Sequence, residues 1–313
     1  MGTALQAPEQ RSISVVTPVY NGEASIAELC RRLGEVLPQL AAEYEIILVN
    51  DGSRDRSWEV ILELSSRTPN VHGLNLMRNY GQHNALLCGI REAKYDVIVT
   101  IDDDLQHPAE EIPRLLERLD EGFDVVYGAP RVEQSGVMRA LASRITRLAL
   151  RAAVGSAVAK NVSAFRVFRT QLREAFAGYH SPFVSIDVLL TWATTRFGAT
   201  KVAFQPRHSG SSNYTFTKLV RHALDMMTGF STAPLQVASL IGFTCTLFGL
   251  AVFIYVFVRY CLEGSVPGFP FLASIIAIFS GAQLFALGVI GEYLARMHFR
   301  SMKRPAYVVR TTI

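Results

Sequence analysis

The chain has 313 residues, of which 50% are hydrophobic and 19% charged, and its formal net charge is +4. This balance excludes a disordered or collagen-like chain, and the length leaves room for one large domain or two ordinary ones. Because soluble domains carry about 25% charged residues, the low charge predicts a membrane segment. A net charge of +4 is too small to indicate a nucleic acid partner.

The four cysteines lie far apart in the sequence, and none belongs to a Cys-x-x-Cys pair: Cys30, Cys88, Cys245 and Cys261. We therefore expect neither a zinc site nor a disulfide framework. Residues 1–10 contain neither the basic nor the apolar segment of a secretory signal peptide. The N-terminal part is thus expected to stay in the cytoplasm.

The first half of the chain alternates between β-branched segments and amphipathic segments, which predict strands and connecting helices. The predicted strands are 12–17, 45–50, 71–76, 96–101 and 124–127, and the predicted helices are 24–37, 57–66, 82–93 and 110–119. This alternation is typical of an α/β fold, with a parallel sheet between two layers of helices. Ligands bind such sheets at the carboxyl ends of the strands, so the residues after each strand are candidate site residues.

The segments after the first two predicted strands carry polar side chains. Pro18 is expected to shape a turn, and Tyr20 and Glu23 are placed to meet a ligand; the alternative is an ordinary strand-to-helix loop. Asp51 follows the second strand and can accept hydrogen bonds from a nucleobase edge. The alternative there is an Asp-Gly turn followed by a helix cap at Asp55.

The segments after the third and fourth predicted strands carry charged side chains. Arg78 follows the third, and its guanidinium fits phosphate oxygens, although a surface loop is the alternative. After the fourth come Asp102, Asp103 and Asp104, with Gln106 two residues later. Adjacent acids repel one another unless a cation is bound, and oxygen ligands suit Mg²⁺ or Mn²⁺ on a diphosphate. An acidic turn with a helix cap is the alternative.

A basic amphipathic segment, 136–154, follows the predicted sheet. It predicts a helix at the interface with an anionic membrane, and a solvated basic face over a protein core is the alternative. Arg139 and Ser143 lie four residues apart, hence on one helix face. Together with Arg131, they can bind a lipid-linked phosphate through charge-assisted hydrogen bonds.

A polar segment with one arginine, Arg207, precedes the apolar end of the chain. It suits a mobile lid over phosphates, and a simple linker is the alternative. The next segment, 213–231, combines apolar residues with Lys218 and Arg221, and predicts a second interfacial helix.

Two long uncharged runs, at about 235–258 and 267–291, close the chain. Each exceeds the roughly 20 residues that cross a bilayer as a helix. The residues after Glu292 carry several basic side chains and no acid, whereas the link between the runs is short. The positive-inside rule then predicts a hairpin in the cell membrane, with the N-terminal domain and a basic C-terminal tail both cytoplasmic.

The segments 18–23, 51–53, 78–81 and 102–106 together resemble the family 2 inverting glycosyltransferases. Within that family, the chain is similar to the polyprenyl-phosphate group of dolichyl-phosphate mannose synthase. The segments 78–83, 281–283 and 291–294 resemble more closely the undecaprenyl-phosphate aminoarabinose-type transferases. The resemblance covers nearly the whole chain and implies a GT-A fold at 1–212, an interfacial helix at 213–231 and a two-helix membrane anchor with its tail at 232–313.

The resemblance also implies residue roles and substrates. Donor binding falls to Pro18, Tyr20, Glu23, Asp51, Arg78, Asp102, Asp103 and Gln106, and acceptor-phosphate binding to Arg131, Arg139, Ser143 and Arg207. Asp102 and Asp104 would hold Mg²⁺ or Mn²⁺, and Asp104 and Asp187 are the candidate catalytic acids. Arg131 is displaced by one residue from the family pattern, and Asp187 has a helix-start acid as its alternative.

The predicted function is transfer of a sugar from a nucleotide diphosphate, with UDP favoured, to an undecaprenyl or dolichyl phosphate. An ionised phosphate needs no strong base, so positioning and charge stabilisation are expected to dominate. The alternatives are a processive polysaccharide synthase, whose Gln-x-x-Arg-Trp segment does not occur here, and a non-catalytic membrane scaffold. Relatives can assemble through their anchors, which allows a homo-oligomer.

Overall fold

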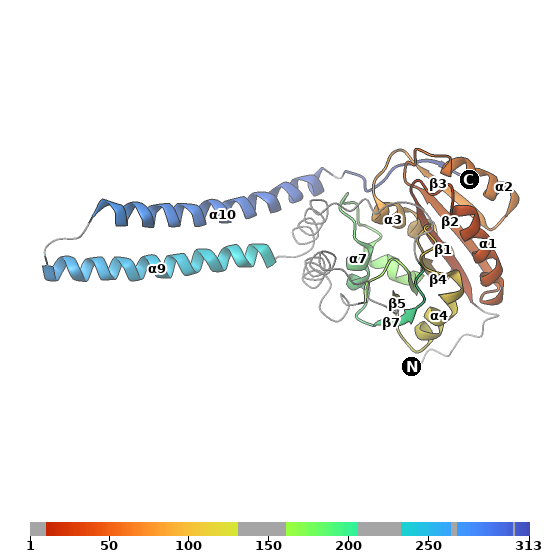
Figure 1. The fold of residues 1–313 in the computed structure, drawn as a ribbon, viewed down its shortest axis with the longest axis horizontal. Helices are drawn as coiled ribbons and strands as arrows, with labels where there is room; N and C mark the ends of the chain where they lie inside the picture. The colour runs from red at the N-terminus through yellow and green to blue at the C-terminus, as the bar shows by residue number, and fades with distance from the viewer. Residues whose placement is uncertain (1–10, 131–160, 206–232, 264–267, 303) are drawn as a thin grey trace.

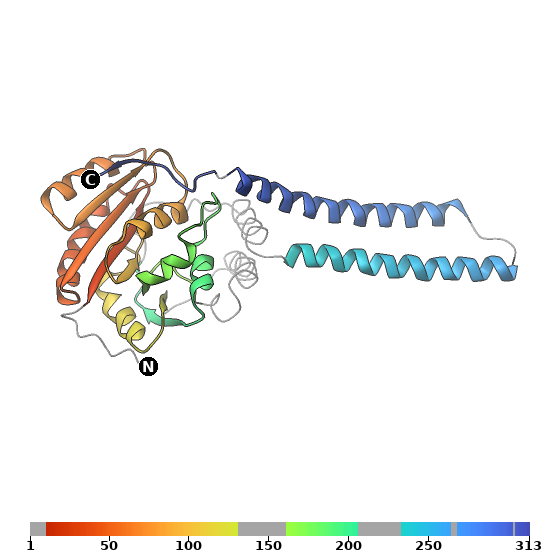
Figure 2. The same cartoon turned by 180° about the vertical axis from the view of Figure 1, so that it is seen from behind.

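A computed structural model describes residues 11–130, 161–205, 233–263, 268–302 and 304–313. An α/β domain stands at one end, and two long helices extend from it side by side (Figures 1 and 2). The predicted interfacial segments 136–154 and 213–231 lie outside the described residues, as do four predicted acceptor residues: Arg131, Arg139, Ser143 and Arg207.

The domain is built on one sheet of eight strands in the order β7-β5-β6-β4-β1-β2-β3-β8. Strand β6 runs antiparallel to both of its neighbours and β8 runs antiparallel to β3, whereas the other pairings are parallel. The strands are β1 (Ser12–Val19), β2 (Glu43–Asn50), β3 (Val71–Leu76), β4 (Val97–Thr100), β5 (Val125–Pro130), β6 (Arg166–Arg169), β7 (Phe197–Val202) and β8 (Val309–Thr312).

Helices cover both faces of the sheet, because side chains that alternate along each strand are apolar on both sides. Ile13 and Val15 of β1 join one buried cluster, with α1 and α4, and Val16 joins the other, with α3 and α7. The helices are α1 (Ile26–Val36), α2 (Ser57–Arg67), α3 (Gln82–Glu92), α4 (Ile112–Asp120) and α7 (Ile186–Ala193), with short 3-10 segments η2 (Leu37–Gln39), η3 (Ala109–Glu111) and η4 (Thr170–Phe176).

The predicted turn at Pro18 is wrong. Pro18 is buried inside β1, opposite Val49 of β2, and the strand continues to Val19. A proline without an N–H is tolerated here because β4 pairs with β1 only as far as Val16, opposite Thr100. By strand alternation, the missing N–H of Pro18 would point to the side where β4 has already ended.

Two long helices follow the domain, α9 (Ala233–Glu263) and α10 (Phe269–Ser301). They contain stretches long and apolar enough to cross a membrane: Pro234–Leu262, with mean hydropathy 2.3, and Ile278–His298, with 1.4, neither of them buried in the protein. Large apolar side chains such as Leu240 and Phe253, each 65% exposed, cover α9. Exposed apolar surface on this scale is typical of helices that cross a membrane.

The C-terminal tail differs from the expected basic extension. Its residues Val309–Thr312 form β8, which pairs with β3 in the register Leu74 to Thr312 and is the last strand on that side of the sheet. The chain therefore leaves the domain through α9 and returns to it after α10, so that its last residue lies beside β3 and α2 (Figures 1 and 2). Three of its four residues are β-branched, which favours a strand, but the segment is short, lacks alternation of apolar side chains and does not indicate its partner.

The contact between α3 and the sheet supplies a first prediction. A Cβ at Gly89 would lie 2.4 Å from Val16 and 3.0 Å from Val49, whereas one at the exposed Gly34 of α1 would meet nothing within 4 Å. We expect Gly89→Ala to lower the free energy of unfolding by about 1–3 kcal/mol through overpacking. Gly34→Ala is the matched control and is expected to raise it by about 0.5–1 kcal/mol through helix propensity. Urea unfolding of the detergent-solubilised protein measures both, and equal stabilities would contradict the packing argument.

Candidate active site

The carboxyl ends of β4, β1, β2 and β3 lie next to one another, since these strands are neighbours in the sheet. The four segments that follow them therefore form one edge, here called the donor edge: residues 20–25, 51–56, 77–81 and 101–108. This edge brings together most of the predicted donor residues: Tyr20, Glu23, Asp51, Arg78, Asp102, Asp103, Asp104 and Gln106.

The first two segments of the donor edge are bonded to each other. Glu23 accepts a hydrogen bond from the Arg56 N–H at 2.9 Å, and its own N–H donates to Asp55 at 3.2 Å. Asn21, with a φ of 56°, accepts from the Arg54 N–H at 2.9 Å. Asp55 also accepts from the Ser57 N–H at 3.1 Å, but the N-cap position of α2 is taken by Arg56, so the predicted cap lies one residue too early. Glu23 thus orders the loop, and its predicted donor contact stays a prediction.

Asp51 holds the third segment in place through hydrogen bonds to its backbone. Its side chain is buried, and its two oxygens accept hydrogen bonds from the N–H groups of Tyr80 at 2.7 Å and Gly81 at 2.8 Å. Burial raises the pKa of Asp51, whereas those two N–H groups and the nearby Arg78 act in the opposite direction. Each carboxylate oxygen can accept a further hydrogen bond. Asp51 could thus also accept a hydrogen bond from a nucleobase, and that contact stays a prediction.

Two exposed side chains stand at the donor edge and can meet an incoming ligand. Tyr20 is 47% exposed. Arg78 is also exposed, and its guanidinium lies 4.5 Å from the centre of the Tyr80 ring, which orients it. A guanidinium held in this way can bind phosphate oxygens without first losing much side-chain freedom.

The three consecutive acids after β4 lie in different surroundings. Asp102 accepts a hydrogen bond from the Gln82 amide at 2.7 Å, and Asp104 accepts from the Gln106 N–H at 3.1 Å; both carboxylates are partly exposed. Asp103 points inward instead, so that a Cβ at Gly22 would lie 2.1 Å from its Oδ2. Burial, and then the charges of Asp102 and Asp104, raise the pKa of Asp103 to about 7.

The oxygen ligands offered by this acidic segment suit a divalent cation that also binds a ligand of the protein. Asp102 and Asp104 supply hard oxygen ligands, and a cation would offset the repulsion that their charges impose on Asp103. Among the described residues, no group of three acidic, histidine or cysteine side chains is arranged to hold an ion alone. Phosphate oxygens of a ligand would therefore complete the coordination, as is usual for Mg²⁺.

Asp187, at the start of α7, lies in a buried network. Its Oδ1 pairs with Nη1 of Arg166 and accepts a hydrogen bond from the Tyr127 hydroxyl at 3.0 Å. Arg166 is only 1% exposed, and its Nε donates to Thr100 at 3.1 Å. Burial and the Asp187 carboxylate raise the pKa of Tyr127 well above its usual value. These contacts join β4, β5, β6 and α7 beneath the acidic segment, and a catalytic role of Asp187 stays a prediction.

Sequence reasoning missed Arg166 and Tyr127 as the partners of Asp187. Both lie in short apolar strands, where Arg166 interrupts the run Phe165 to Phe168. A charged residue in such a run is almost never buried without a partner. That rule was the available indication of an ion pair, although it does not say which acid provides the partner.

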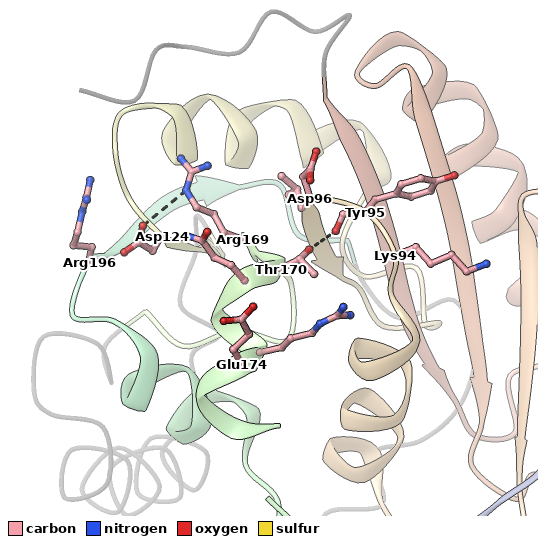
Figure 3. Close-up of a pocket in the computed structure, with 11 residues that line it drawn as sticks. Lys94, Tyr95, Asp96, Asp124, Arg169, Thr170, Glu174 and Arg196 are labelled. Carbon is pink, nitrogen blue, oxygen red and sulfur yellow. Dashed lines mark hydrogen bonds and ion pairs between the residues drawn. The ribbon is translucent and has the colours of Figure 1, made fainter. Parts of the chain in front are cut away.

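A cleft of about 510 Å³ lies at the opposite edge of the sheet (Figure 3). Asp96, Asp124 and Arg196, which line it, each precede a strand directly. The charged groups there serve the fold: Asp124 accepts from the Thr194 hydroxyl at 2.6 Å and lies 3.8 Å from Arg169. None of the predicted site residues lines this cleft.

Comparison with known proteins decides the family. The model of the family described as Glycosyl transferase family 2 matches residues 14–176, just over half of the chain and all four segments of the donor edge. The chain is a family 2 glycosyltransferase. Its resemblance to this family is thereby confirmed, and the predicted α/β fold of GT-A type with it.

Curated relatives of this glycosyltransferase match along nearly its whole length. The undecaprenyl-phosphate 4-deoxy-4-formamido-L-arabinose transferase of Pectobacterium carotovorum is 36% identical over 97% of this chain and 94% of its own. Those of Photorhabdus laumondii and Pseudomonas aeruginosa are 33% and 35% identical, over 97% and 96% of this chain and 94% and 90% of their own. The shared length includes the two apolar helices.

A solved structure supports the fold of the glycosyltransferase domain. Glucosyl-3-phosphoglycerate synthase from Mycobacterium tuberculosis, in complex with Mn²⁺, uridine diphosphate and glucosyl-3-phosphoglycerate, superposes with a TM-score of 0.50. The match covers 70% of this chain and 78% of that chain at 17% identity. At this identity, the likeness concerns the fold alone.

The buried ion pair of the glycosyltransferase supplies a second prediction. Arg166→Met leaves the Asp187 carboxylate buried without its guanidinium, so the free energy of unfolding is expected to fall by about 3–5 kcal/mol. In the double variant Arg166→Met/Asp187→Leu neither charge is present, and most of that loss should return. Urea unfolding measures the difference. A double variant that is no more stable than Arg166→Met would show that the pair is not what holds this region together.

Proposed function

We propose that this glycosyltransferase transfers a sugar from a nucleotide diphosphate, with UDP favoured, to a polyprenyl phosphate, with inversion at the anomeric carbon. The observation that carries the proposal is the placement of Asp102 and Asp104 on the donor edge, beside Arg78 and the exposed Tyr20. The two long apolar helices supply the second half of the argument, since a polyprenyl acceptor is present only in a membrane.

On the donor side, Asp102 and Asp104 would hold Mg²⁺ or Mn²⁺ together with the diphosphate oxygens of the donor. The bound cation supplies neutralisation of the charge that develops on the leaving nucleoside diphosphate. Arg78 adds a fixed positive charge at the same edge, and Tyr20 offers an aromatic surface to the nucleoside. Asp51 and Glu23 keep the segments that carry these groups in place.

On the acceptor side, the phosphate is already ionised at neutral pH, so its oxygen can attack without a strong base. The new bond joins this oxygen to the anomeric carbon as the bond to the diphosphate breaks, and the nucleoside diphosphate leaves. Relatives of 33–36% identity carry undecaprenyl phosphate in their names, which supports a polyprenyl acceptor. Arg131, Arg139, Ser143 and Arg207 are the proposed phosphate ligands, and Asp187 would orient the sugar or act as a base.

We also propose that the domain and the tail lie on the cytoplasmic face. The basic residues after Glu292 favour that side, and β8 pairs with the domain's own sheet, so the tail and the domain are on the same side of the membrane. The proposed parts are a glycosyltransferase domain at 1–212, an interfacial segment at 213–231 and an anchor with its tail at 232–313.

A transfer assay tests the reaction and the donor together. The detergent-purified protein, with Mn²⁺ or Mg²⁺ and a short polyprenyl phosphate, is offered a panel of UDP- and GDP-sugars. We expect a single UDP-sugar to yield a glycosylated polyprenyl phosphate by mass spectrometry, and EDTA to abolish the product. Chain products of many sugars would favour a processive synthase. Folded protein that neither binds nucleotide nor forms product would favour the scaffold.

The two carboxylates can be tested against a matched control. Asp102→Asn and Asp104→Asn each remove a charged ligand, so we expect kcat/KM to fall on the order of 100-fold or more, with weaker Mn²⁺-dependent binding of UDP. Glu110→Gln makes the same kind of change at an exposed position just after the acidic segment, and should retain activity. Steady-state kinetics and calorimetry provide the readouts, and equal losses in all three variants would argue against a metal site here.

A further inference from the structure

The last residues of the chain are built into the domain. Ala306 is buried in the α3 face of the core, and the Tyr307 ring lies 5.7 Å from the Arg91 guanidinium. At the end of the chain, Ile313 exchanges two backbone hydrogen bonds with Gly73, of 3.1 and 3.0 Å, and its side chain packs against the opposite face of the core. The tail therefore contributes to both layers of the domain.

The tail also holds Met77, the first residue of the third segment of the donor edge. The Met77 N–H donates to the Val308 carbonyl at 2.9 Å, and the Met77 carbonyl accepts from the Arg310 guanidinium at 3.2 Å. The tail thus engages both backbone polar groups of Met77. The next residue is Arg78, the proposed phosphate ligand.

Two further contacts continue from that point toward the proposed metal site. Asp51 binds the N–H groups of Tyr80 and Gly81, and the Gln82 amide donates to Asp102 at 2.7 Å. Between Met77 and Gln82 the chain is therefore held at three places, by the tail, by Asp51 and by Asp102. Loss of the first would leave Met77 and Arg78 held on the N-terminal side only through β3, whose pairing with β2 ends at Asn75.

The apolar helix α10 is also linked to α3, through the segment that carries Pro182 and Phe183. The Arg296 guanidinium lies 4.9 Å from the centre of the Phe183 ring. The neighbouring Pro182 carbonyl accepts from the Asn84 amide of α3 at 3.3 Å. α10 is therefore linked to the start of α3 only indirectly, through Phe183 and Pro182, whereas β8 contacts the segment before α3 directly.

We propose that β8 is a positioning element of the donor site: docking of residues 306–313 on β3 sets Arg78 and Gln82 for the nucleotide diphosphate and its cation. Arg310 is the positioning residue. This inference rests on the proposed function. Without the tail, β3 becomes an open edge strand, and donor binding must order the segment 77–82 that the tail otherwise holds in advance. The effect should fall on the donor and leave the lipid acceptor unchanged.

The experiment compares the wild type with a truncation that ends at Pro305 and retains both membrane helices. We expect the truncation to raise the donor KM and the Kd for UDP with Mn²⁺ about tenfold or more, and to leave the polyprenyl phosphate KM within about twofold. The amide protons of Tyr80 and Gly81 should also exchange faster with solvent. A synthetic peptide of residues 305–313 should restore the UDP affinity by adding a strand, whereas a scrambled peptide should not.

A pair of point variants covers the case in which the truncation fails to fold. Arg310→Ala removes the contact with Met77, whereas Arg304→Ala removes the same charge from an exposed residue between α10 and β8. We expect only Arg310→Ala to raise the donor KM, by about threefold to tenfold, with kcat little changed. Equal effects of the two variants would overturn the proposal, as would unchanged amide exchange in a folded truncation.

These readouts separate the inference from the proposed function. A wild type that binds no nucleotide and forms no product would refute the proposed function. Amide exchange at residues 77–82 needs no ligand, so it still decides whether the tail holds the segment. Normal transfer in the wild type with unchanged UDP affinity in the truncation would refute the inference alone.

Discussion

The donor edge depends on the hydrogen bonds that the buried carboxylate of Asp51 accepts from the neighbouring segment. A parallel sheet places the ends of β2 and β3 side by side, but it leaves the segments that follow them free to diverge. Asp51 prevents this by accepting the N–H groups of Tyr80 and Gly81, whose desolvation would otherwise be costly. With that segment held, Arg78 is presented to the edge, and Gln82 reaches Asp102.

Charge crowding is the second constraint, and the protein handles it differently in two places. In the buried network of Asp187, the positive charge of Arg166 compensates the negative charge of Asp187, so this ion pair needs no ligand. At the donor edge, three acids are adjacent, and the one whose Oδ2 is buried, Asp103, has its pKa raised to about 7. In the proposed function, a cation shared with a diphosphate would relieve the repulsion among these three acids.

The chain after α10 is more than a flexible tether, because it forms a strand of the domain's own sheet. Apolar helices are sufficient to anchor a protein in a membrane, so a flexible tail after them would serve that purpose as well as an ordered one. Here the chain returns from α10 and adds a strand beside β3, immediately before the segment that carries Arg78. An enzyme whose acceptor lies in the bilayer and whose donor is soluble must bring both to one place. In the proposed arrangement, the tail links the anchor to the donor segment through backbone hydrogen bonds.

The sequence alone determined the elements whose information is local. Alternating β-branched and amphipathic segments identified β1 to β5 and α1 to α4 within a few residues, and long uncharged runs identified α9 and α10. The order of strands in a parallel sheet then placed Asp51, Arg78 and Asp102 at one edge. Only the tertiary structure decided the antiparallel strands β6 and β8, the position of Pro18 inside β1 and the pairing of Asp187 with Arg166. Each of these depends on hydrogen bonds or charges between residues far apart in the chain, and no local period or spacing encodes such a partner.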